Sequence, residues 1–198
     1  IYGGYSASAG TGASFPNLSV NTNNGIQLED MSDLKVRHTL FFELGHVSLN
    51  GWNLVVGERY PGNITGYDEN SFVITGTQPG GGFLYREQVS ASDSLVVFPM
   101  GAAHNDYSPV AVKNNGNTPA DLHARVFDSV YQQAISGQVM GPGHVQKTWN
   151  VVQGGTAAND LSVWLQYNRQ DEGPLYALNR DSSYVTAFAG DGWDSVPP

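Results

Sequence analysis

The sequence contains no cysteine, so neither disulfide bonds nor thiolate metal sites are available to it. It also lacks any apolar run near the length of about 18 residues that a membrane-spanning helix needs. Basic residues are few, with 9 Lys and Arg against 18 Asp and Glu, which gives a net charge of −9. Because phosphate contacts need clustered cations, this balance argues against nucleic acids and anionic membranes as partners.

Signatures of catalysis are missing too. The sequence has no G-x-S-x-G nucleophile elbow, no P-loop and no G-x-G-x-x-G after a strand. No two of the five histidines have a zinc-binding spacing: they are His38, His46, His104, His123 and His144. The candidates for the paired acids of a glycoside hydrolase are Glu43, Glu58, Asp68, Glu69 and Glu87, but acids at solvated strand ends are the commoner explanation. We therefore expect a protein that is not an enzyme and needs no cofactor.

Turn-forming residues, in contrast, are abundant. The chain contains 24 Gly and 10 Pro, and only 14% of its residues are charged. Turn residues repeated at short intervals are typical of β-sandwiches, barrels and solenoids. We expect an all-β fold with almost no helix, divided into an arm (1–16), a unit of short strands (17–77) and a β-sandwich unit (83–198). The Gly-rich stretch 78–82 is then a hinge between the last two.

The first unit shows short apolar pulses, most with period two, which puts the apolar residues on one face of a strand. The pulses are 18–20, 26–28, 34–36, 40–42, 47–49, 54–56 and 72–74. Their spacing is too tight for long hairpins and fits short strands joined by tight turns, as in the rungs of a β-solenoid. A compact meander is the alternative.

The second unit shows longer strands with clean alternation, the pattern of an antiparallel sandwich. The residues expected to share one apolar core are Trp149, Val163, Leu165 and Phe188. Trp164 lies on the opposite face from its neighbours and either packs on another layer or contacts a partner. The one helix candidate is the short segment 128–136.

The N-terminal arm is rich in Gly, Ser and Ala, whose small side chains bury little surface. The arm residues expected to contact another subunit are Ile1, Tyr2, Tyr5 and Phe15. Main-chain hydrogen bonding is the expected way to order such a segment, as when an extended peptide adds a strand to a sheet. The arm either adds a strand to an adjacent copy of the chain or folds back as a cap over its own first strands.

A series of short phrases runs along the chain in a fixed order. They are Leu40–Gly57 (LFFELGHVSLNGWNLVVG), Phe72–Thr77 (FVITGT), Gly82–Arg86 (GFLYR), Phe98–Gly101 (FPMG), Tyr107–Val110 (YSPV), Lys147–Val151 (KTWNV), Leu165–Tyr167 (LQY), Asp171–Gly173 (DEG) and Gly192–Asp194 (GWD). Together they resemble phrases of large cell-surface proteins of the Bacteroidota that are exported by the type IX secretion route. The resemblance implies an extracellular or cell-surface location and a role in display, adhesion or scaffolding rather than catalysis.

The two ends of the sequence bear on this resemblance. Such proteins usually end in a sorting domain, whereas this sequence ends at Pro197-Pro198. The chain also begins with Ile1 rather than Met. We expect either a mature exported chain whose targeting segment has been removed or a piece of a longer protein.

Three kinds of candidate site follow. Oxygen ligands at Asp68, and at Asp191 with Asp194, are candidates for Ca²⁺, which often rigidifies loops of extracellular proteins. Trp52 beside a turn and Trp193 near the end are candidates for stacking on sugars.

Asp-Ser-apolar triplets form the third kind of candidate site. They resemble the O-glycosylation motif of the same bacterial group and occur at Ser94, Ser129 and Ser195. Only exposed copies of such a triplet are open to modification.

Two functions are consistent with these features. The first is a structural subunit or adhesin module of a bacterial surface assembly, in which copies of the chain join through strand contacts into a filament. The second is a glycan-binding module of a surface complex. An arm lying in a neighbouring copy favours the first, whereas exposed Trp and Tyr around a shallow groove favour the second.

Overall fold

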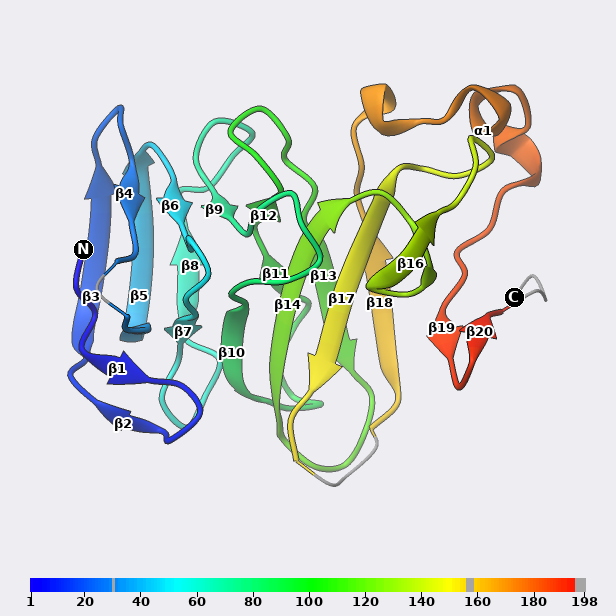
Figure 1. The fold of residues 1–198 in the computed structure, drawn as a ribbon. Coiled ribbons are helices and arrows are strands. Elements are labelled where there is room, and N and C mark those ends of the chain that lie inside the picture. Colours follow the sequence, from blue (N-terminus) through cyan, green and yellow to red (C-terminus); the bar gives the residue numbers. More distant parts are fainter. Residues whose placement is uncertain (30, 156–158, 195–198) are drawn as a thin grey trace.

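The computed structural model describes residues 1–29, 31–155 and 159–194, and its chain is almost entirely β (Figure 1). Strands hold 48% of the residues and helices 6%, which confirms the all-β expectation. The strands are β1 (Tyr5–Ser6), β2 (Thr11–Gly12), β3 (Phe15–Asn21), β4 (Ile26–Gln27), β5 (Leu34–Leu44), β6 (Val47–Ser48), β7 (Leu54–Val56), β8 (Asn63–Thr65), β9 (Val73–Ile74), β10 (Leu84–Val89), β11 (Val96–Phe98), β12 (Met100–Gly101), β13 (Val110–Asn114), β14 (Ala120–Asp128), β15 (Tyr131–Gln133), β16 (Ser136–Val139), β17 (Lys147–Gln153), β18 (Leu161–Leu165), β19 (Phe188–Ala189) and β20 (Gly192–Trp193). The helical pieces are η1 (Arg169–Asp171), α1 (Pro174–Leu178) and η2 (Arg180–Ser182). No helix in the described ranges has the length and apolar character needed to span a membrane.

The first half of the chain is a β-solenoid-like stack of coils. Each strand pairs in parallel with the strand at the same position of the next coil: β3 with β5, β5 with β7 and β8, and β7 with β10. On a second face of the stack, β4, β6, β9 and β12 form a parallel sheet. The predicted apolar pulses lie in or beside these strands, although 34–36 and 40–42 belong to the single strand β5.

Apolar residues repeat in register from coil to coil and form ladders inside the stack. One ladder consists of Ile26, Val47, Val73 and Met100, and another of Leu34, Leu54 and Leu84. All of them except Ile26 are fully buried. Because one coil cannot bury its apolar face alone, the coils are stable only when they are stacked.

Beyond the stack, the pairs β10–β14, β14–β17, β11–β13 and β13–β18 are antiparallel. Strands β14 and β17 extend the seven-stranded sheet, whose order is β17-β14-β10-β7-β5-β3 with β8 beside β5. Strands β11, β13 and β18 form a second sheet. One core cluster joins the two sheets, with Val112 from the second and Ala124 from the first. This part is the sandwich that the sequence predicts.

The Gly-rich segment 78–82 is pinned to the sandwich. The guanidinium group of Arg125, on β14, donates to the backbone oxygens of Thr75 (3.2 Å), Gln78 (2.7 Å) and Pro79 (2.8 Å). Arg125 is fully buried and lies between two aromatic rings whose centroids are 5.7 Å away. The strands on either side of the segment share one sheet and one core, so the segment does not serve as a free hinge.

The helix predicted over 128–136 is wrong. This stretch contains β15 and the start of the β15–β16 hairpin instead. Ser129 and Ala134 have φ values of 72° and 57°, and an α-helix has no place for residues in that left-handed region. The short helix α1 lies further along the chain.

The predicted four-residue core of the sandwich is half wrong. Trp149 and Leu165 pack against the main core cluster. Val163 is 43% exposed and Trp164 is 53% exposed, because β18 ends its sheet and neither face of it is fully covered. Phe188 lies apart, in the β19–β20 hairpin. The alternation of apolar residues identified β18 as a strand, but it did not show that β18 is the edge strand of its sheet.

The N-terminal arm lies on its own chain as a cap. Tyr5 is buried and exchanges backbone hydrogen bonds with Asp33 (3.0 and 3.2 Å). The backbone N–H groups of Gly3 and Gly4 donate to the Ser32 hydroxyl. A side chain at Gly3 would put its Cβ 2.0 Å from the Asp33 oxygen, so this close approach requires glycine. Of the two arrangements left open by the sequence, the single chain adopts the cap.

We predict that Arg125→Met lowers the free energy of unfolding by about 2–4 kcal/mol, because three buried carbonyl groups lose their hydrogen-bond donor. Arg169→Met, at an exposed site, is the matched control and should change stability by less than about 0.5 kcal/mol. Urea unfolding followed by circular dichroism measures both variants. Equal stabilities would mean that Arg125 does not hold the 78–82 segment.

Candidate functional site

A hollow lies where the C-terminal segment, residues 174–194, passes over the end of the sandwich. Figure 1 shows the course of that segment. Its volume is about 670 Å³, within the range of small-molecule sites. The residues that line it are Val130, Met140, Gly143, His144, Val145, Lys147, Thr148, Trp149, Leu165, Tyr167, Leu175, Tyr176, Asn179, Ser182, Ser183, Tyr184, Val185, Thr186, Trp193 and Asp194. We call this hollow the C-terminal cleft.

Five aromatic rings line the C-terminal cleft. They are Trp149, Tyr167, Tyr176, Tyr184 and Trp193. The two indoles are fixed by hydrogen bonds, since Nε1 of Trp149 donates to the Ser108 oxygen (3.0 Å) and Nε1 of Trp193 to the Tyr131 oxygen (2.8 Å). The Tyr167 and Tyr176 hydroxyls lie 3.2 Å apart. The cleft therefore has an oriented aromatic lining.

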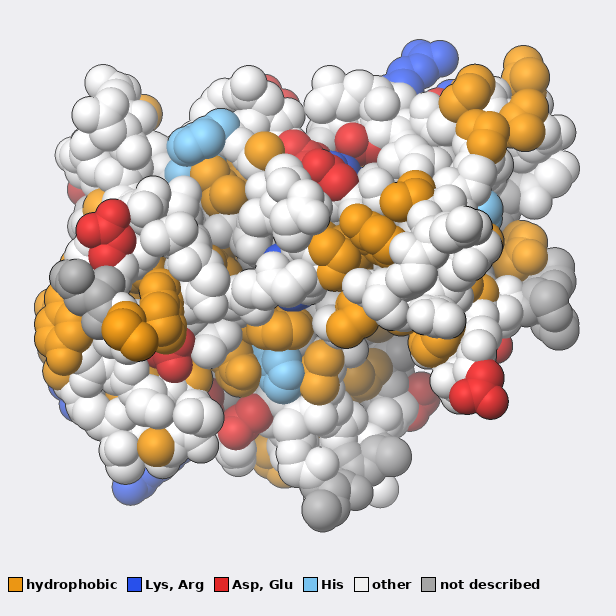
Figure 2. All heavy atoms as spheres, in the orientation of Figure 1, with side chains coloured by type: hydrophobic (Ala, Val, Ile, Leu, Met, Phe, Trp, Pro, Cys, Tyr) orange, Lys and Arg blue, Asp and Glu red, His pale blue; other side chains and the backbone are white. Residues whose placement is uncertain are grey.

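Polar groups are set among these rings. The lining includes the amide of Asn179 and the hydroxyls of Ser182, Ser183 and Thr186. Asp194 is the single carboxylate among the described lining residues. Figure 2 shows hydrophobic side chains gathered on this face over β17 and α1.

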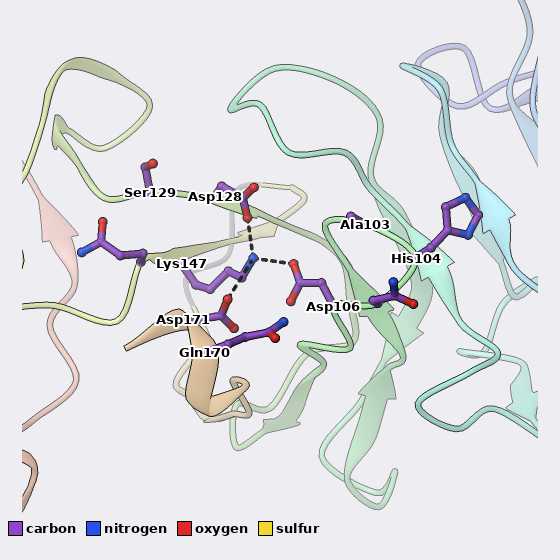
Figure 3. A pocket seen from close by; sticks show the side chains of 10 residues that line it. Ala103, His104, Asp106, Asp128, Ser129, Lys147, Gln170 and Asp171 are labelled. Carbon is purple, nitrogen blue, oxygen red and sulfur yellow. Dashed lines mark hydrogen bonds and ion pairs between the residues drawn. The ribbon is translucent and has the colours of Figure 1, made fainter. Parts of the chain in front are cut away.

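A cluster of charges borders the cleft at Lys147, the first residue of β17. The Lys147 ammonium, whose side chain is 4% exposed, donates to the carboxylates of Asp106 and Asp128. A third carboxylate, Asp171 on η1, lies 3.6 Å away. Figure 3 shows these acids around the ammonium group in a smaller hollow of about 520 Å³. One buried cation thus joins β17, the end of β14, the β12–β13 loop and η1.

The electrostatics of this cluster are those of a structural site. Burial opposes the charge on Lys147, but the hydrogen bonds that its ammonium donates to Asp106 and Asp128 outweigh that effect and raise the pKa of Lys147. Burial raises the pKa of Asp171, and the nearby Lys147 partly offsets that effect. Asp106 also accepts from the Ser108 hydroxyl (2.8 Å) and the Asn168 amide (3.0 Å). Since the carboxylates of Asp106 and Asp128 are both engaged by the ammonium, the cluster offers no free pair of acids for catalysis.

The two loops predicted to bind Ca²⁺ lie in different parts of the molecule. Asp68 lies in the loop before β9 in the solenoid, whereas Asp191 and Asp194 belong to or follow the β19–β20 hairpin at the other end of the molecule (Figure 1). Across the described ranges no group of three or more His, Asp or Glu side chains is placed to hold a metal ion.

The two predicted sugar-stacking tryptophans have different places. Trp52 follows the turn after β6. Its side chain faces inward, so it is partly buried and packs against the core. Trp193 lines the C-terminal cleft.

The predicted O-glycosylation positions also differ. Ser94 is exposed, and Ser129 is half-buried with its carbonyl oxygen accepting from the Thr148 hydroxyl. Ser195 lies outside the described residues.

The arm residues are split in the same way. Ile1, Tyr2 and Phe15 are exposed at the first end of the stack, and Tyr5 is buried in its own chain. Tyr5 is therefore unavailable to a neighbouring copy while the cap is in place.

Sequence reasoning missed Lys147 and most of the aromatic lining. One feature of the sequence did point to Lys147. It is two and four residues before Trp149 and Val151, so it lies on the strand face that was expected to be apolar. A charge at such a position needs a buried partner. Comparison with family models, curated proteins and solved structures finds no match for this chain, so residue geometry supplies the support for a function.

We predict that Lys147→Met lowers the free energy of unfolding by about 3–5 kcal/mol, because three carboxylates then lose their shared counter-charge. Lys113→Met on β13 is the control, since its ammonium bonds only backbone oxygens near the surface. Chemical denaturation at neutral pH compares the two. Adding Asp106→Asn to Lys147→Met should recover part of the loss; no recovery would mean that charge is not the cause.

Proposed function

We propose that this protein is a non-catalytic carbohydrate-binding module of a bacterial cell surface, with the C-terminal cleft as its binding site. The observation that carries the proposal is the lining of five aromatic rings with amide and hydroxyl groups between them. Sugars present C–H faces that stack on aromatic rings and hydroxyls that pair with such polar groups. The cleft combines both kinds of partner in one hollow.

The arrangement favours binding over cleavage. Hydrolysis of a glycosidic bond commonly uses two carboxyl groups that flank the bond. The described lining has one carboxylate, Asp194, and the nearby acids are held by Lys147. A sugar chain in the cleft would thus be held without a second acid to act on it.

Two further observations agree with a place at the cell surface. The ordered phrases along the sequence resemble surface proteins of the Bacteroidota, and the chain is free of cysteine. A net charge of −9 disfavours binding to nucleic acids, but it does not oppose binding to neutral polysaccharides.

The test is binding of soluble polysaccharides in affinity gel electrophoresis, with tryptophan fluorescence for affinity. Tyr184→Ala and Trp193→Ala should each weaken binding at least about ten-fold, because each removes a ring from the lining. Trp164→Ala is the control, since Trp164 is exposed on β18 and does not line the cleft. Retained binding in both cleft variants would contradict this site.

A second candidate is a structural subunit that joins copies end to end. It is supported by the two sheet ends, since β3 pairs only with β5 and β18 only with β13 among the described strands. An unpaired strand edge is a template for pairing with another chain. Exposed apolar residues lie at both ends, with Phe15 at one and Val163 at the other.

If this second function holds, the protein forms oligomers. Val163→Lys should then dissociate them into folded monomers, because a charge on an edge strand blocks strand pairing. Leu178→Lys, on exposed α1, is the control. Analytical ultracentrifugation over a wide concentration range decides the question. A chain that stays monomeric throughout would exclude strand-mediated assembly.

A further inference from the structure

Two histidines from distant parts of the sequence meet at the surface of the solenoid. His46 lies in the short turn between β5 and β6, and His104 lies in the loop between β12 and β13. Their Nδ1 atoms are 3.4 Å apart, and their rings stand at 85° to one another. Figure 2 shows histidine side chains exposed above β6 and β9, and Figure 3 shows the His104 ring directed away from the Lys147 cluster.

The separation of these nitrogen atoms suits a shared metal ion as well as a long hydrogen bond. Hydrogen bonds from N–H groups typically span about 2.7–3.2 Å, so 3.4 Å is long for one. Two imidazole nitrogens on a tetrahedral ion, each about 2.05 Å from the metal, lie about 3.3 Å apart. The pair therefore already has the spacing of two ligands of one ion.

The scaffold holds His46 in place. Its backbone oxygen accepts from the N–H of Ile26 (2.8 Å), and its ring meets the Phe72 ring edge to face at a centroid distance of 4.5 Å. Its Nε2 atom is buried and has no hydrogen-bond partner. Burial and the neighbouring His104 lower the pKa of His46, which keeps the imidazole neutral as a metal ligand requires.

We propose that His46 and His104 bind one divalent transition-metal ion through their Nδ1 atoms. Imidazole ligands suit Zn²⁺, Ni²⁺ and Cu²⁺, whereas Ca²⁺ and Mg²⁺ prefer oxygen. In the described part of the chain no third side chain completes the site, so water or a ligand from solution supplies the other positions. Asp68 is near enough to act on His46 electrostatically and favours a cation there.

A metal ion at this site would tie the turn after β5 to the loop after β12. These segments are 58 residues apart in sequence and belong to different coils. An ion that binds only the folded chain stabilises it, so the melting temperature should rise with metal concentration.

The experiment is isothermal titration of the untagged protein with ZnCl₂ at neutral pH, with visible absorption of the Co²⁺ complex as a second readout. We expect one Zn²⁺ per chain and a tetrahedral Co²⁺ spectrum. His104→Ala, at an exposed position, should weaken binding at least ten-fold and abolish the rise in melting temperature. His46→Ala should do the same if it folds.

His144→Ala is the matched control and should leave the affinity unchanged, because the His144 ring bonds the backbone oxygen of Gly141 instead of a second imidazole. CaCl₂ in excess should not compete. Absence of Zn²⁺ binding at millimolar metal, or full binding by His104→Ala, would overturn the proposal.

Discussion

Two buried guanidinium groups hold together the loops on which the rest of this fold depends. Arg86 donates to the backbone oxygens of Pro61 (2.9 Å) and Gly62 (3.0 Å), and also to that of Val97. Arg125 does the same for the 78–82 segment. Neither arginine is paired with a carboxylate in the described chain, and burial lowers the pKa of Arg86 to about 10. Each arginine donates hydrogen bonds, in place of water, to loop carbonyl groups. The stacked coils would otherwise leave these groups without a donor. Parallel coils and antiparallel sandwich can therefore share one sheet.

The C-terminal cleft is built from a rigid side and a lightly held side. Its rigid side is β17, which is hydrogen-bonded to β14 along seven residue pairs and anchored by Lys147. On the other side, α1 has no buried residue, and Leu178 projects into solvent. Segments with few buried contacts open at low free-energy cost. The side that carries α1 can thus move at lower cost than β17, which holds Trp149 in place.

The sequence was a good guide to strands and a poor guide to sites, for physical reasons. Interior positions of a coil must be apolar, so alternation located the strands of the stack. It could not show that 34–36 and 40–42 form one strand, because β5 pairs first with β7 and then with β8, and the spacing along the chain does not reveal which strands pair. Tyr167 and Tyr184 of the aromatic lining lie in irregular segments, and Tyr176 lies in the short helix α1, so strand alternation does not place them at the cleft. The pairing of His46 with His104 depends on the coil register, which spacing along the chain does not reveal.

The stacking direction also determines how this molecule responds to tension. Residue 1 and β20 lie at opposite ends of the stack, and the strands run across the line that joins them (Figure 1). A pulling force between these ends acts along the ladder hydrogen bonds rather than along the strands, so it loads one pair of strands at a time. The C-terminal segment, whose helix α1 has no buried residue, and the cap formed by Tyr5 and Asp33 would open before single coils, each coil releasing about 3.3–3.6 Å of chain per residue. A chain stacked in this way would lengthen in steps under load.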